Sequence, residues 1–171
     1  KGRIILPQVQ VLRDLLDSNC LSYVVKETEL AQALENLKTP PSLVVTDSQA
    51  FKKVSEIVPD SIPLTSFSIL FARLKGDLDV FVKGAEAIDN LKDGDRVLIL
   101  ESCTHHAIED DIGRVKIPRW LREKTGKDLI IDNVAGHDFP DISKYSLVIH
   151  CGACMTNRRE VLSRILIAGQ K

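Results

Sequence analysis

The chain has 171 residues, of which 44% are hydrophobic and 27% charged, and its formal net charge at pH 7 is −1. This length suits one medium domain or two small ones, and the composition is typical of an ordered globular protein. The balanced charge creates no field that attracts nucleic acid or an anionic membrane, and no apolar run approaches the roughly 20 residues of a membrane span. We therefore expect neither nucleic acid nor a membrane as a partner.

The first 76 residues alternate apolar runs of strand type with amphipathic helical patterns. After an opening helix over 9–16, a pattern of about 20 residues repeats. The strand-type runs of this repeat lie at 22–25, 42–45 and 62–64. The helix N-caps are expected at Thr28, at Asp47 or Ser48, and at Ser66. Strands that alternate with helices indicate parallel pairing through right-handed crossovers, so we predict a small α/β unit over 1–76.

A second α/β unit is predicted over residues 77–171, with Gly76-Asp77 as the boundary. It opens with an amphipathic helix over 78–91 and closes with another over 157–167. Its apolar strand-type runs lie at 96–100, 129–131 and 147–149. The expected fold is therefore α/β throughout, as two small units of parallel sheet with flanking helices.

Cysteine and histidine residues follow two of the predicted strands. Cys103 and His105 form a C-x-H motif just after the strand at 96–100, and H-C-x-x-C at 150–154 follows the strand at 147–149. The carboxyl ends of parallel strands meet at one edge of a sheet, so we expect the two motifs to meet in space. Thiolate and imidazole donors suit zinc or an iron–sulfur cluster and argue against magnesium or calcium.

The donor count leaves more than one interpretation open. A structural zinc site is usually closed by four ligands, whereas five donors compete here: Cys103, His105, His150, Cys151 and Cys154. Three cysteines are one fewer than an all-cysteine cubane needs, so a [4Fe–4S] cluster would keep one iron with an exchangeable ligand. We favour the cluster, with a zinc-stabilised structural or interaction module as the alternative. A redox dithiol is the weakest interpretation because it gives Cys103 and both histidines no role.

The C-T-H and H-C-x-x-C pair resembles the HydF family of [FeFe]-hydrogenase maturation proteins. The resemblance extends to G-R-V-K-I-P-R-W over 113–120, to N-R-R-E over 157–160, and to the opening residues 1–8. In that family a GTPase domain precedes a dimerisation domain and a [4Fe–4S] cluster domain. The resemblance implies that this chain holds the dimerisation domain (1–76) and the cluster domain (77–171). Without the GTPase domain we expect no enzymatic activity, no catalytic residue, and GTP binding only through the missing domain.

The resemblance also implies a function. The chain would be a scaffold and carrier in assembly of the hydrogenase H-cluster, binding a [4Fe–4S] cluster and delivering a diiron precursor as cargo. Its expected partners are a second copy in a homodimer, the apo-[FeFe]-hydrogenase, and the radical-SAM maturases that make the precursor. No secretory signal opens the sequence, and the expected location is the cytoplasm.

Site residues follow from the matching motif positions. The cluster's cysteine ligands would be Cys103, Cys151 and Cys154. His105 is a candidate fourth ligand, and His150 is either an alternative ligand or a hydrogen-bond donor beside the cluster. The carboxylates that compete with His105 for the open iron are Glu109 and Asp110, unless they form a solvated acidic loop. The positive charges that would attract an anionic precursor, unless they form surface ion pairs, are Arg114, Lys116, Arg158 and Arg159.

Overall fold

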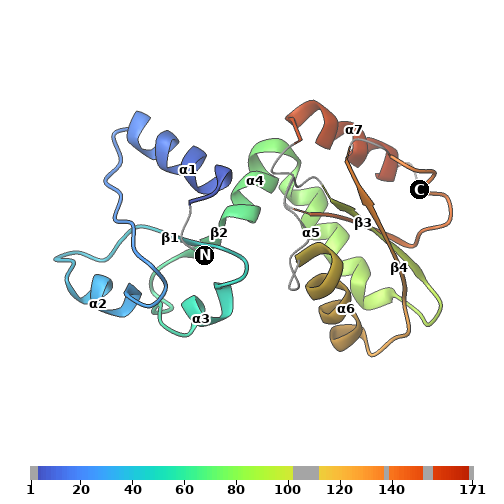
Figure 1. The fold of residues 1–171 in the computed structure, drawn as a ribbon, viewed down its shortest axis with the longest axis horizontal. Helices are drawn as coiled ribbons and strands as arrows, with labels where there is room; N and C mark the ends of the chain where they lie inside the picture. The colour runs from blue at the N-terminus through green and yellow to red at the C-terminus, as the bar shows by residue number, and fades with distance from the viewer. Residues whose placement is uncertain (1–3, 102–111, 137–138, 152–155, 170–171) are drawn as a thin grey trace. The chain divides into compact units, whose positions relative to one another are not determined.

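The computed structural model describes residues 4–101, 112–136, 139–151 and 156–169 (Figure 1). The chain divides into two compact units, Lys1–Leu70 and Phe71–Lys171. In chain order its elements are α1 (Leu6–Asp17), α2 (Leu30–Glu35), β1 (Val44–Thr46), α3 (Phe51–Ser55), β2 (Leu64–Ser66), α4 (Phe67–Lys75), α5 (Leu78–Glu86), a 3₁₀ turn (Ala87–Asn90), β3 (Arg96–Glu101), a π-helical turn (Ile112–Lys116), α6 (Ile117–Thr125), β4 (Ile130–Ala135), β5 (Leu147–His150) and α7 (Arg158–Gly169). None of the helices among the described residues combines the length and apolar character of a membrane span.

The first unit contains a two-stranded parallel sheet. Its strands β1 and β2 pair from Val44 opposite Leu64 to Thr46 opposite Ser66. The core beside the sheet consists of Leu30, Val54, Val58 and Ile62. These residues come from α2, from α3 and from the segment that leads into β2, so the helical and strand-type patterns of the repeat converge on one core. The parallel α/β architecture predicted for this unit is confirmed.

Some details of the first unit differ from the sequence prediction. The run at 22–25 forms no strand, and its Tyr23 and Val24 are 60% and 58% exposed. An apolar, β-branched run becomes a strand only where its side chains can pack against a sheet, and here most of them face solvent. Cys20, which follows the turn that ends α1, is exposed.

The predicted helix caps are correct at one position out of three. The hydroxyl of Ser66 accepts a hydrogen bond from the backbone N–H of Ile69 at 3.4 Å, at the start of α4. The residues before α2 and α3 are Glu29 and Ala50, and neither side chain caps its helix. Both have helical backbone angles, and turns at 27–29 and 48–50 lead into the two helices, so the start of each helix is a gradual turn and not a single capped residue.

The second unit is built on a parallel sheet with strand order β4-β3-β5. Its central strand β3 is almost fully buried, because both faces of the sheet are covered. On one face Val97 packs with Leu121 of α6, and on the other Leu98 and Leu100 pack in a cluster that Ala168 of α7 adjoins. Helices therefore cover both faces of a parallel sheet, as the sequence predicted.

Local sequence signals explain where two helices of this unit begin and end. The Asp77 carboxylate accepts hydrogen bonds from the backbone N–H groups of Asp79 and Val80, at 3.1 and 3.2 Å, and so caps α5. Helix α6 has Pro118 in its first turn and ends at Gly126, whose φ of 65° is left-handed. The helix expected over 78–91 is confirmed as α5 and the 3₁₀ turn that follows it.

Candidate metal centre

The strand order of the second sheet defines a topological switch point. From β3 the chain passes through α6 to β4 on one side, and then returns to place β5 on the other side of β3. Ligand sites in parallel sheets lie outside the carboxyl ends of the two strands where the connections diverge. Here those strands are β3 and β5, and each leads directly into one half of the cysteine motif: Cys103 is two residues beyond β3, and Cys151 is the first residue after β5.

Hydrogen bonds beyond the strand ends keep this carboxyl edge in register. The backbone N–H of Cys151 donates to the carbonyl of Leu100 at 2.9 Å, and the N–H of Gly136 donates to the carbonyl of Glu101 at 3.1 Å. Gly136 has a φ of 93°, which lets the chain turn immediately after β4. Cys151 is half-buried. Its backbone hydrogen bond to Leu100 fixes it beside the end of the central strand.

His150, the last residue of β5, contacts a buried arginine. Its Nε2 atom lies 3.0 Å from Nη1 of Arg164 on α7, and the Arg164 side chain is only 5% exposed. The second terminal nitrogen of Arg164 donates to the carbonyl of Gly136 at 3.0 Å and to the carboxylate of Glu160 at 2.6 Å. The arginine therefore joins α7 to the ends of β4 and β5.

Glu101, at the end of β3, is a buried carboxylate that sequence reasoning missed. Nε of Arg114 donates to both of its oxygens, at 3.2 and 3.1 Å, so the pair joins the two ends of the segment that carries Cys103. A Cβ atom at position 113 would lie 3.0 Å from a carboxylate oxygen of Glu101, so any residue larger than glycine would crowd this side chain. The sequence feature that could have identified Glu101 is a charged residue at the end of an otherwise apolar strand.

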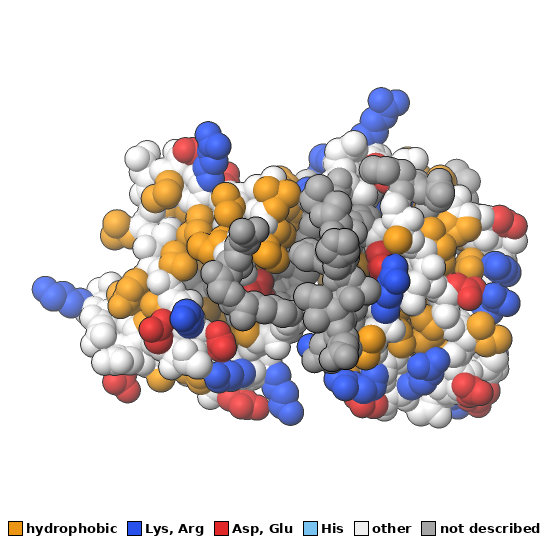
Figure 2. Space-filling view, in the orientation of Figure 1, with side chains coloured by type: hydrophobic (Ala, Val, Ile, Leu, Met, Phe, Trp, Pro, Cys, Tyr) orange, Lys and Arg blue, Asp and Glu red, His pale blue; other side chains and the backbone are white. Residues whose placement is uncertain are grey.

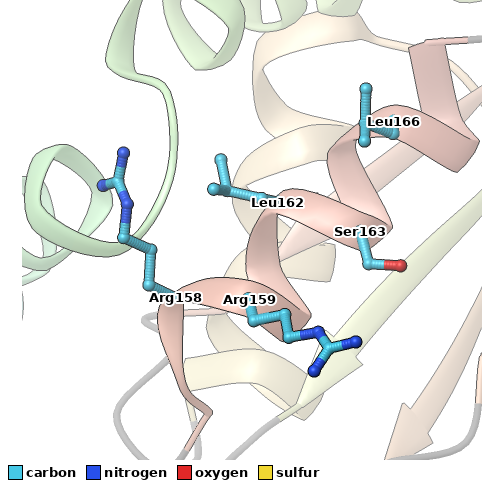
Figure 3. A pocket seen from close by; sticks show the side chains of 5 residues that line it. All are labelled: Arg158, Arg159, Leu162, Ser163 and Leu166. Atoms are coloured by element: carbon cyan, nitrogen blue, oxygen red, sulfur yellow. The ribbon is translucent and has the colours of Figure 1, made fainter.

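The structure gives individual contacts for the predicted basic residues. Arg114 is paired with Glu101, and Arg158 donates from Nη1 to the carbonyl of Leu74 at 2.6 Å. Arg159 is exposed. Arg158 and Arg159 both line an open pocket on α7, and their side chains point in different directions (Figure 3). Lys116 is half-buried at the end of the π-helical turn. Attraction of an anion by these four residues stays a prediction.

Among the described residues, shifted pKa values occur in an ion pair near the amino end of β3. The Arg96 guanidinium donates to the Asp132 carboxylate at 2.6 Å and, with a further hydrogen bond from Tyr145 at 2.9 Å, lowers the pKa of Asp132 below its ordinary value. The same contact raises the pKa of Arg96. Tyr145 is buried, whereas Trp120 is 42% exposed.

The remaining predicted ligands lie outside the described residues: Cys103, His105, Glu109, Asp110 and Cys154. Within the part of the chain that the structure describes, no group of three metal-ligating side chains is assembled. The two described donors, the thiol of Cys151 and the imidazole of His150, are ligand types that suit zinc or iron, and they are consecutive residues at the switch point. Cluster or zinc binding stays a prediction from the motif.

The fold and this edge define a class of protein: a two-unit α/β protein whose paired cysteine motif follows the two strands of a switch point. A family model described as the hydrogen maturase F dimerization domain matches residues 1–76, and one described as the hydrogen maturase F tetramerization domain matches residues 79–171. The chain belongs to the hydrogen maturase F family, which gives it a role in hydrogenase maturation and supports self-association. The predicted family is thereby confirmed. No curated protein matched the chain.

Proposed function

We propose that this chain is the self-associating and cluster-binding part of a hydrogenase maturation scaffold. It holds a [4Fe–4S] cluster through Cys103, Cys151 and Cys154, and it carries a diiron precursor that it delivers to the apo-[FeFe]-hydrogenase. The observation that carries the proposal is the position of the cysteine motif, whose two halves leave the adjacent strands β3 and β5 at the switch point.

Chain geometry supports one site for both halves. Neighbouring strands lie about 4.8 Å apart, and two residues of extended chain span at most about 7 Å. Cys103 follows Glu101 by two residues, and Cys151 is bonded through its backbone to Leu100 beside it. Both halves of the motif therefore begin within a few residues of the same point on the carboxyl edge of the sheet.

A [4Fe–4S] cluster with three cysteine ligands supplies one iron whose remaining ligand is exchangeable. The candidates that the sequence gives for that ligand are His105, His150, Glu109 and Asp110. Helix α7 begins at Arg158, soon after the H-C-x-x-C motif, and its first N–H groups favour negative charge there. Arg159, exposed in the first turn of α7, adds positive charge that suits an anionic precursor.

Anaerobic reconstitution with iron and sulfide tests the proposal against a zinc-stabilised module. The expected product is brown, with broad absorption near about 400 nm. Chelation followed by circular dichroism provides the comparison, because a protein folded around structural zinc unfolds when the metal is removed. A colourless protein that retains one zinc per chain and takes up no iron or sulfide would rule out the cluster.

Self-association through the first unit is part of the proposal. The extended segment 21–25 exposes apolar side chains, with Leu21 fully exposed and Val24 58% exposed, and hydrophobic side chains gather on the visible face of this unit (Figure 2). A second copy that covers this segment would bury the apolar surface and pair its backbone.

Changing Leu21 and Val24 together to Asp should weaken the homodimer at least about 10-fold while leaving the melting temperature of the monomer unchanged. The expected selectivity arises because both side chains are exposed in a single chain, so that only assembly buries them. Sedimentation equilibrium measures the association, and Leu74→Asp, a change at another exposed leucine (65%), is the control. A wild-type chain that is monomeric at micromolar concentration would contradict self-association.

A further inference from the structure

Arg164 is a buried cation on α7, and the described part of the chain places three acceptors around it. Its side chain is 5% exposed, and a charge at this depth is stable only when its hydrogen-bond donors are satisfied. The acceptors are Nε2 of His150 at 3.0 Å, the carbonyl of Gly136 at 3.0 Å and the carboxylate of Glu160 at 2.6 Å. One guanidinium therefore contacts the last residue of β5, the first residue after β4, and its own helix.

The contact with His150 fixes the state of the imidazole. A guanidinium has donors only, so Nε2 at 3.0 Å must accept, and it carries no proton. The ring is then neutral, with its proton on Nδ1. The Nε2 lone pair that accepts from Arg164 does not bind a metal at the same time. Glu160 balances the charge of the arginine, which keeps the guanidinium in place without a charge on the ring.

We propose that Arg164 is a positioning residue for the cysteine edge: it orients His150 as a supporting group with Nε2 turned away from any metal, and it ties together the ends of β4 and β5. The proposal rests on the proposed function where it concerns the cluster. Cys151 directly follows His150, so the orientation of His150 sets the point from which the H-C-x-x-C motif starts. The planar fork of an arginine, which a lysine lacks, is what allows one side chain to hold three acceptors.

The first test reads the imidazole directly in metal-free protein. Long-range proton–nitrogen NMR of ¹⁵N-histidine-labelled chain should show an unprotonated Nε2 and a protonated Nδ1 for His150, assigned by the signal that His150→Gln removes. Arg164→Met should replace this pattern with exchange between the two tautomers. A protonated Nε2 in the wild-type chain, or a pattern unchanged by Arg164→Met, would overturn the proposal.

The second test measures how firmly reconstituted iron is held against a chelator. A glutamine at position 150 has a side-chain carbonyl that can accept from Arg164, so His150→Gln should hold iron nearly as well as wild type. His150→Leu and Arg164→Met should lower the chelator concentration that removes half of the iron about 10-fold, the scale expected for groups that support a ligand. Arg164→Lys, which keeps the charge but not the fork, should fall between them.

The outcomes separate this proposal from the proposed function. If His150→Gln loses iron as fully as Cys151→Ala, then His150 is a ligand and the positioning role is wrong. If the wild-type chain itself takes up no iron, the proposed function fails, and the tautomer of His150 in metal-free protein still decides the Arg164 contact. Should His150→Leu fail to fold, the glutamine variant and the NMR pattern give the answer.

Discussion

Replacing Cys151 by alanine is expected to abolish iron–sulfur binding by the reconstituted chain without unfolding it. The backbone N–H of Cys151, and not its thiol, donates to the carbonyl of Leu100, so alanine preserves this contact with β3. A cluster site with three cysteines has no spare thiol to replace the missing one. The iron and acid-labile sulfide contents should therefore fall from about four per chain to near zero, together with the absorption near about 400 nm.

The chain provides its own matched control for this experiment. Cys20 is the only cysteine outside the two motifs, and it is exposed in the first unit at the end of α1. Cys20→Ala should keep full iron and sulfide contents, whereas Cys103→Ala and Cys154→Ala should lose them as Cys151→Ala does. Circular dichroism confirms that each variant is folded. Full iron content in Cys151→Ala, or an equal loss in Cys20→Ala, would contradict the assigned ligand set.

The sheet of the second unit was predictable because its central strand has an unambiguous pattern. A strand buried on both faces reads as a continuous apolar run, and Val97–Leu100 is such a run, with turn residues on the amino side and a charged residue at the carboxyl end. The run at 22–25, Ser-Tyr-Val-Val, also has strand-type composition, yet it forms no strand. Apolar composition alone does not specify which strand will lie alongside, and pairing depends on that neighbour.

The support of the candidate site was not predictable in the same way. Arg164 has the i, i+4 partner Glu160, which in the sequence reads as an ordinary ion pair on the exposed side of a helix. Its other partners, Gly136 and His150, are 28 and 14 residues away and come together only when β4, β5 and α7 pack. Candidate ligands were thus predictable from local spacing, whereas the residues that contact them depend on tertiary packing.

Leu100→Ala is expected to destabilise the second unit by about 2–5 kcal/mol, because the change leaves a cavity in a fully packed core. Leu100 is 1% exposed, and it packs with Leu98, Ile142 and Tyr145 on the face of the sheet that α7 adjoins. Thermal or urea unfolding followed by circular dichroism measures the loss. Leu166→Ala, at a leucine of α7 that is 68% exposed, is the matched control and should change stability by less than about 0.5 kcal/mol.

The same substitution tests whether the sheet positions the cluster. The carbonyl of Leu100 holds Cys151, and the residue lies opposite His150 in the parallel register, so a cavity here loosens the edge from which both halves of the cysteine motif leave. Leu100→Ala should therefore lower the iron content after reconstitution even at temperatures where the chain is still folded, although every predicted ligand is present. Unchanged iron content in a destabilised variant would show that the ligands assemble independently of the strand ends.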